Sequence, residues 1–267
     1  MNRYMVTLDE NNSADRESLR RYFTVFQTVM TMMFKRNKDY QSVSHLIYTE
    51  QAIEYVAFDI HPLDFVDMKF RDFLDYRAQT QTALFQNRFE FSSYWLHEDG
   101  SNTMLLFLPA LPGKEQVDVE VYSKIIAKMI SIEPTVKEPQ LNKFHHFILL
   151  SEKGLNPVVK NRLKIYPDVH FETYKDSAFA MDVTEHCLAP VSVVEYIKKS
   201  GVDKWEDEED LVASKQHNIR ENDPFAIMYG AKIGDVMVLT TMGGSHNTRI
   251  EYKITTPAAK IEPPKIK

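Results

Sequence analysis

Apolar side chains recur at steps of three and four residues from Glu17 to Lys35, and this period predicts an amphipathic helix. A second helix is predicted from about Thr49 to Phe58. A third is predicted between Ile60 and Asn87, where four aromatic residues stand at roughly helical spacing: Phe65, Phe70, Phe73 and Tyr76. The polar residues 1–16, which precede the first helix, are expected to be flexible.

Strands and helices alternate in the next part of the chain. Apolar runs predict strands at 89–96, 102–109, 144–150 and 169–174. Helices are predicted at 117–130 and from Asn156-Pro157 to Leu163. Because helix follows strand repeatedly, this region predicts an α/β domain with a mixed sheet.

Gly and Pro divide the last third of the chain into short segments. Pro224 can begin a helix with Asp223 or Asn222 as its N-cap, and Gly230 can end it. Two paired strands are predicted by the run 237–239 and by the alternation of Ile250, Tyr252 and Ile254, with Gly243-Gly244-Ser245 at the turn between them. These short elements predict a small α+β domain.

Composition restricts the class of protein. The 267 residues are 43% hydrophobic and 12% aromatic, enough for a packed core in one large domain or two small ones. A net charge of −6 gives no overall positive field, so any contact with nucleic acid has to be local. The single cysteine, Cys187, excludes a disulfide framework and a multi-cysteine zinc site. No apolar run approaches the length of a membrane span, and the protein is expected to be soluble and intracellular.

A series of short motifs stands in a fixed order in the last third. They are Thr184-Glu185-His186, Leu188-Ala189-Pro190, Asn222-Asp223-Pro224, Tyr229-Gly230-x-Lys232-x-Gly234 and Tyr252-Lys253. Their order resembles the assembly domain of the fifth shared subunit of eukaryotic nuclear RNA polymerases, and the corresponding archaeal RNA polymerase subunit consists of this domain alone. Several anchors in one order are far more specific than any single tripeptide.

The resemblance widens toward the N-terminus. Leu105 to Pro109 with the helix around Val119 to Lys124, and Ile148 to Leu150 with Leu155-Asn156-Pro157, resemble the jaw domain of the same subunit. The resemblance implies an α/β jaw domain of nuclease-like topology over 1–176 and an α+β assembly domain over 177–267, with a flexible tail at 256–267. Two segments, 59–87 and 131–142, are interpreted as insertions that decorate the surface.

The resemblance also implies a function. A noncatalytic subunit of a DNA-directed RNA polymerase is expected, with no cofactor and no metal, which docks on the largest subunit and lies near downstream DNA. Residues expected near DNA are Asn156, Pro157, Lys160 and Arg162, where free N–H groups at the helix start and the basic side chains would give a weak, sequence-independent contact. Residues expected at the largest subunit are Thr184, Glu185, His186, Pro190, Asp223, Pro224, Tyr229, Gly230, Lys232, Arg249, Tyr252 and Lys253. The expected location is the nucleus, or a cytoplasmic viral factory or virion if a virus encodes the chain.

This chain departs from the family's pattern at several positions. The jaw loop reads Asn156-Pro157-Val158-Val159, which keeps the proline but lacks the usual hydroxyls. Positions that are usually basic are Asn218, Ile227 and Ile233 here. Both departures put the corresponding contacts in doubt.

Two other classes of function stay open. A nuclease-like enzyme needs an Asp and a Glu-x-Lys on neighbouring strands to hold a metal ion, but Leu106-Phe107-Leu108 stands where acid and base are required. A free-standing transcription adaptor could use the same assembly domain.

The histidines in His145-His146 and Glu185-His186-Cys187 are interpreted as core or surface residues whose hydrogen bonds are satisfied, because neighbours along a strand point to opposite faces. The acidic run 206–210 is interpreted as a solvated loop or helix start, with a docking site for a basic partner as the alternative.

Overall fold

The computed structural model describes residues 7–36, 40–48, 53–57, 61–79, 85, 87–109, 115–131, 146–183, 191–209, 211–242 and 248–257. Residues 132–142 of the predicted insertion at 131–142, and residues 258–267 of the C-terminal tail, therefore lie outside the described residues. The chain divides into two compact units: unit 1 comprises 1–31 with 37–181, and unit 2 comprises 32–36 with 182–267. Within the described residues, no helix combines the length and apolarity needed to cross a bilayer.

Unit 1 is built on a six-stranded mixed sheet in the order β2-β1-β3-β4-β5-β6. The strands are β1 (Tyr40–Tyr48), β2 (Ile53–Ala57), β3 (Ser93–His97), β4 (Asn102–Phe107), β5 (His146–Ser151) and β6 (His170–Lys175). Neighbours from β2 to β4 pair antiparallel, whereas β4, β5 and β6 run parallel. The predicted mixed sheet is confirmed.

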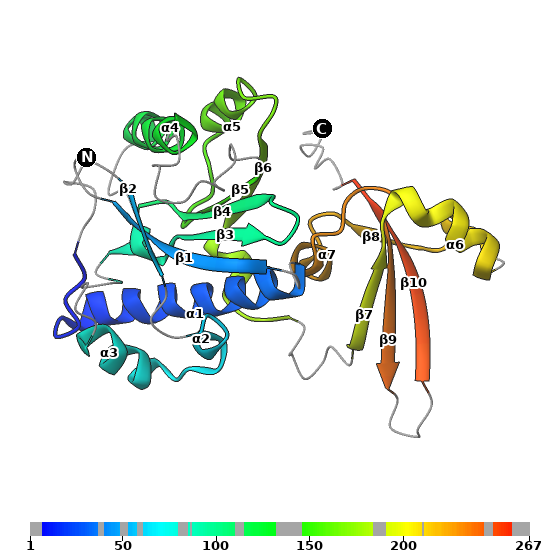
Figure 1. Ribbon diagram of the computed structural model, residues 1–267, viewed down its shortest axis with the longest axis horizontal. Coiled ribbons are helices and arrows are strands. Elements are labelled where there is room, and N and C mark those ends of the chain that lie inside the picture. Colours follow the sequence, from blue (N-terminus) through cyan, green and yellow to red (C-terminus); the bar gives the residue numbers. More distant parts are fainter. Residues whose placement is uncertain are drawn as a thin grey trace, which may run out of the picture. The chain divides into compact units, whose positions relative to one another are not determined.

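Helices cover both faces of this sheet, so unit 1 has three layers (Figure 1). The helices are α1 (Ser13–Arg36), α2 (Asp64–Asp67), α3 (Phe70–Gln79), α4 (Glu115–Ser131) and α5 (Pro157–Leu163), with the 3-10 turns η2 (Arg88–Phe91) and η3 (Asp176–Phe179). Residues 32–36 of α1 belong to unit 2. Side chains alternate along β4, so Met104 and Leu106 pack in the core under α4 and α5. Phe107 points to the other face, where its ring lies 6.2 Å from that of Phe26 on α1.

The first helix begins earlier than the sequence predicts. The side chain of Asn12 accepts a hydrogen bond from the backbone N–H of Ala14 at 3.0 Å, which satisfies one of the free donors at the start of α1. Leu8 is buried. The expectation that residues 1–16 are flexible is therefore wrong for 7–16, because the polar residues there cap and anchor the helix; 1–6 lie outside the described residues.

The predicted helix at 49–58 is also wrong, because residues 53–57 form strand β2. This strand pairs antiparallel with β1, which periodicity did not identify. A run of five residues is too short for its period to separate helix from strand, and β-branched Ile53 and Val56 favour the strand once a partner is present.

The segment 59–87 is part of the core and does not decorate the surface as expected. Its Phe65, Phe73 and Phe85 are 0% exposed. Phe65 and Phe85 place their rings 5.5 and 5.6 Å from that of Phe26 on α1, so this segment supplies the hydrophobic layer that α1 needs. Phe85 adopts a φ of 61°, a left-handed conformation that is rare for a bulky residue.

Unit 2 is built on a four-stranded sheet in the order β7-β9-β10-β8. Its elements are β7 (Val191–Ile197), η4 (Lys199–Gly201), α6 (Val202–Glu209), η5 (Ala213–Lys215), β8 (His217–Arg220), α7 (Pro224–Tyr229), β9 (Val236–Met242) and β10 (Thr248–Thr256). The predicted antiparallel pairing of the last two strands is confirmed, and β8 adds to β10 in parallel. Residues 206–209 of the acidic run lie at the end of α6.

Two separate apolar clusters hold the two helices of unit 2. Ala226 of α7 packs with Met237 and Leu239 of β9, whereas Trp205 of α6 packs with Val236. Because Val236 and Met237 are neighbours along one strand, they point to opposite faces, and each face of the sheet carries one helix.

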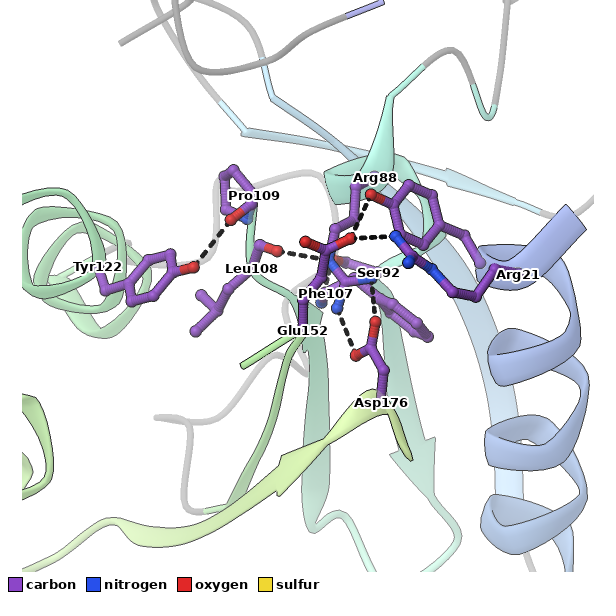
Figure 2. A network of polar contacts seen from close by, with 10 residues as sticks. Arg21, Arg88, Ser92, Phe107, Leu108, Pro109, Tyr122, Glu152 and Asp176 are labelled. Carbon is purple, nitrogen blue, oxygen red and sulfur yellow. Dashed lines mark hydrogen bonds and ion pairs between the residues drawn. The ribbon is translucent and has the colours of Figure 1, made fainter. Parts of the chain in front are cut away.

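A buried ion pair closes the core of unit 1 (Figure 2). Arg88 is 3% exposed, and its two terminal nitrogens donate to the two carboxylate oxygens of Asp176 at 2.7 and 2.6 Å. Its Nε donates to the carbonyl of Leu108 at 2.6 Å. The guanidinium lies 4.8 Å from the ring of Tyr22 and 5.4 Å from that of Phe107. This one side chain therefore connects η2, the end of β4, η3 and α1.

A second carboxylate extends the network to the helix (Figure 2). Glu152, which follows β5, accepts from the hydroxyl of Tyr22 at 2.6 Å and from Arg21 at 2.5 Å. Burial raises the pKa of Tyr22 to about 12, so its hydroxyl stays a donor at neutral pH. The ends of three parallel strands are thus joined to α1 by polar contacts.

We expect Arg88→Met to lower the free energy of unfolding by about 3–5 kcal/mol, because it leaves the carboxylate of Asp176 buried without its charge partner. The double variant Arg88→Met with Asp176→Leu should recover most of that loss. Lys124→Met is the matched control: its ion pair with Glu120 is 68% and 69% exposed, and such a pair contributes about 0.3–0.5 kcal/mol. Urea unfolding measures all three. Equal losses for Arg88→Met and Lys124→Met would contradict this role.

His45 on β1 generates a prediction about pH. Its ring lies 4.9 Å from that of Phe85, and burial lowers its pKa from 6.5 to about 3. As the pH falls, the unfolded chain therefore takes up this proton before the folded chain does. Between about pH 6.5 and pH 3, His45 should therefore lower stability by up to about 1.4 kcal/mol per pH unit as the pH falls. His45→Phe removes the proton site, so urea unfolding at pH 6 and pH 5 should show a smaller loss in the variant. Equal losses would contradict the assignment.

Candidate functional site

The predicted DNA-proximal residues of unit 1 lie on one short helix, α5. Val159 and Leu163 are buried and fix the helix on the core. The side chain of Asn156 accepts from the N–H of Val158 at 2.8 Å, and Pro157 has no N–H. Two positions at this helix start therefore offer no free donor, and the expected backbone contribution to anion binding is reduced. Any contact with DNA phosphates at this helix therefore depends mainly on the basic side chains.

The basic residues of α5 point in different directions. Lys160 is exposed, whereas Arg162 donates from Nη1 to the hydroxyl of Ser123 on α4 at 3.1 Å. Lys160 and Lys164, one turn apart, line an open pocket of about 480 Å³. Its other lining residues are Leu163, Tyr166, Pro167, Val169, Phe171 and Thr173. Sequence reasoning found Lys160 but missed the pocket, because β6 supplies its opposite wall.

The segment 151–175, which contains all the residues that line this pocket, differs in net charge from the whole chain. Residues 151–175 carry five basic and three acidic side chains, whereas the chain as a whole has a net charge of −6. Lys160, Lys164 and Lys175 are all exposed. The positive charge expected near DNA is therefore present locally, on side chains that solvent reaches.

The predicted interface residues of unit 2 fall into three groups. Thr184, Glu185, His186 and Pro190 lie outside the described residues. Asp223, Pro224 and Gly230 form the ends of α7: the Asp223 carboxylate accepts from the N–H of Phe225 at 2.9 Å, and Gly230 ends the helix with a left-handed φ of 68°. The predicted cap and stop are confirmed. Burial raises the pKa of Tyr229, the last residue of this helix.

The third group lies on β10, where the structure places its members on two faces. Arg249 and Lys253 both pair with Glu251, at 2.8 and 3.4 Å. Lys253 stands opposite Met237 in the sheet, so this charged row lies on the face that α7 covers. Tyr252 points the other way and is half-buried, with its ring 5.3 Å from that of Trp205.

Asp235 organises the surface turn between α7 and β9, and sequence reasoning missed it. One oxygen of its buried carboxylate accepts from the N–H of Lys232 and the other from that of Lys199, both at 2.8 Å. Its carbonyl accepts from the N–H of Thr255 at 2.8 Å. The signal was present in Lys232-x-Gly234-Asp235, because Gly234 adopts a φ of 95° that permits the tight turn. The position of Lys232 thus depends on a buried acid.

The strands of unit 1 carry little of the chemistry that a nuclease requires. The central strands β3, β4 and β5 contain no carboxylate. Within the described residues, one group of three side chains could hold a metal ion: His146, His170 and Glu172. Sequence reasoning treated His146 as a satisfied histidine, because it could not show that β6 places His170 and Glu172 beside it.

Comparison with known proteins assigns no family: no protein-family model and no curated protein matches the chain. Its function therefore has to be inferred from its own residues and their arrangement.

Proposed function

We propose that the chain is a noncatalytic subunit of a multisubunit DNA-directed RNA polymerase. Unit 2 would dock on the largest subunit, and unit 1 would serve as a jaw near downstream DNA. One observation carries the proposal: four of the described residues that carry the sequence resemblance have structural roles in unit 2. Asp223 caps α7, Gly230 ends it, Gly234 turns the chain before β9, and Tyr252 packs on Trp205.

Unit 2 also carries a surface suited to a protein partner. The side chain of Arg249 is 74% exposed, and Lys232 is exposed in the turn that Asp235 fixes. Ile233, next to Lys232 in the same turn, is 48% exposed, and Ile250, on the opposite face of β10 from Arg249, is 52% exposed. Exposed arginine and exposed large apolar side chains are both features of protein interfaces.

Unit 1 would contribute a weak contact with the DNA backbone. The exposed Lys160 and Lys164 lie on a locally basic surface of an acidic chain, which supports a contact that is local and independent of sequence. Its role would be mechanical. Phosphoryl transfer in such enzymes requires a carboxylate cluster that holds metal ions, and the largest subunit would supply that cluster.

We propose a nuclear location, or a cytoplasmic viral factory or virion if a virus encodes the chain.

Two alternatives are separated from this proposal by one purification. The full-length chain, tagged and expressed in the cells that encode it, should co-purify with the two largest polymerase chains in equal amounts. Recovery as a free monomer would favour a transcription adaptor and contradict a core subunit. Metal-dependent cleavage of DNA by the purified chain would favour the nuclease-like enzyme instead.

We expect the double variant Lys232→Glu with Arg249→Glu to reduce recovery of the largest subunit at least tenfold, because it reverses two exposed charges on the proposed interface. A single reversed pair at a close contact costs enough to change affinity by this factor. Lys215→Glu is the matched control, since Lys215 is exposed beside Ala213, which packs with Trp205 of α6. Quantitative co-purification measures the effect, and equal recovery of both variants would exclude this surface.

We expect Lys160→Glu, within the assembled polymerase, to weaken retention of downstream duplex similarly for all DNA sequences. Losing one phosphate contact should lower the slope of log affinity against log salt by about one unit. Lys69→Glu, the control, gives the same charge change at an exposed residue just before α3. Helix α3 and helix α5 lie on opposite faces of the sheet (Figure 1). Identical salt slopes for wild type and Lys160→Glu would leave unit 1 without a DNA contact at this helix.

A further inference from the structure

Three potential metal ligands converge on the two parallel strands at the edge of unit 1. His146 of β5 stands directly opposite His170 of β6, and Glu172 follows two residues later on the same face. The Nε2 atoms of both histidines point at one carboxylate oxygen, Oε1 of Glu172, at 3.0 and 3.7 Å. The three ligand atoms lie within 4.8 Å of one another. The pairing of β5 with β6 thus brings two imidazoles and one carboxylate close enough together to bind the same ion.

We propose that His146, His170 and Glu172 bind one divalent transition-metal ion of the zinc class. Two imidazole nitrogens and one carboxylate oxygen suit Zn²⁺, Co²⁺ or Ni²⁺, whereas Mg²⁺ and Ca²⁺ prefer oxygen ligands throughout. Three protein ligands leave a coordination position open to water. The proposal concerns unit 1 alone and does not depend on assembly into a polymerase.

The side chains need only small movements to reach an ion. With bonds of about 2.0–2.1 Å, the ligand atoms of a tetrahedral site are about 3.3–3.4 Å apart. The side chain of His170 is 52% exposed, whereas those of His146 and Glu172 are 26% and 16% exposed. The most exposed ligand is thus free to rotate inward, and the other two are already held by the strands.

Surrounding polar groups fix the orientation of two ligands. Oε2 of Glu172 accepts from the hydroxyl of Tyr174 at 2.6 Å, which leaves Oε1 facing the histidines. Nδ1 of His146 lies 3.2 Å from the hydroxyl of Thr103, which in turn lies 3.0 Å from Nε2 of His97. Partners of this kind, which hold the second nitrogen of a histidine and the second oxygen of a carboxylate, are typical of metal sites.

The hydroxyl of Thr103 lets His146 change tautomer when an ion binds. Without an ion, Nε2–H of His146 can donate to Glu172 while Thr103 donates to Nδ1. With an ion, Nε2 offers its lone pair to the metal and Nδ1–H donates to Thr103, whose hydroxyl then donates to His97. The hydrogen bond between His146 and Thr103 is therefore kept in both arrangements, because a hydroxyl both donates and accepts.

The test uses the full-length chain, freed of any affinity tag and of bound metal, and titrated with ZnCl₂. We expect one Zn²⁺ per chain in calorimetry. The unfolding midpoint should rise by about 5–10 °C at a Zn²⁺ concentration about 100-fold above Kd, and MgCl₂ at the same concentration should give no rise. Absence of Zn²⁺ binding would overturn the proposal and leave an ordinary hydrogen-bonded histidine pair.

Variants decide whether binding occurs at these residues. His170→Gln and Glu172→Gln should each weaken Zn²⁺ binding at least tenfold, and His170→Gln should fold normally because its side chain is largely exposed. Thr103→Val should weaken binding about 10–100-fold through the lost support of His146. His217→Gln, an exposed histidine of unit 2, is the matched control. Unchanged affinity in His170→Gln and Glu172→Gln would place the ion elsewhere and overturn the assignment.

Discussion

The buried pair of Arg88 and Asp176 is the constraint on which unit 1 depends. A guanidinium inside an aromatic core needs hydrogen-bond acceptors, and here its three nitrogens donate to a carboxylate after β6 and a carbonyl after β4. These contacts join the carboxyl ends of two parallel strands. Because Glu152 after β5 also reaches α1 through Tyr22, the helix and sheet are held by polar geometry as well as by apolar packing.

Both units rely on a buried acid to position an exposed basic surface. In unit 1, Asp176 and Arg88 pair at the end of β6 (Figure 2), and β6 follows α5 with Lys160 and the adjacent Lys164. In unit 2, the carboxylate of Asp235 receives two backbone N–H groups and sets the turn that bears Lys232. A surface held in this way loses little conformational entropy when a partner binds, which favours a scaffold that docks and supports. The net negative charge of the chain leaves such contacts local.

Local signals in the sequence predicted much of this fold. The features that were predicted wrongly or not at all depend on contacts between distant segments. The Asp223 cap and the Gly230 stop depend only on neighbouring residues, so they were predictable. Strand β2 was mistaken for a helix because its identity comes from pairing with β1. The core position of Phe73 could not be read from its own segment, since it depends on the stack with Phe23 of α1. The convergence of His146 with Glu172 likewise follows from strand register.

The central claim is that unit 2 docks on the largest subunit of a polymerase. Hydrogen–deuterium exchange of the full-length chain, alone and bound to the largest subunit encoded by the same genome, tests it most directly. We predict slower exchange in α7 and β10 of the bound chain, with no change in α2 and α3. Unchanged exchange throughout unit 2, or protection confined to unit 1, would contradict the account.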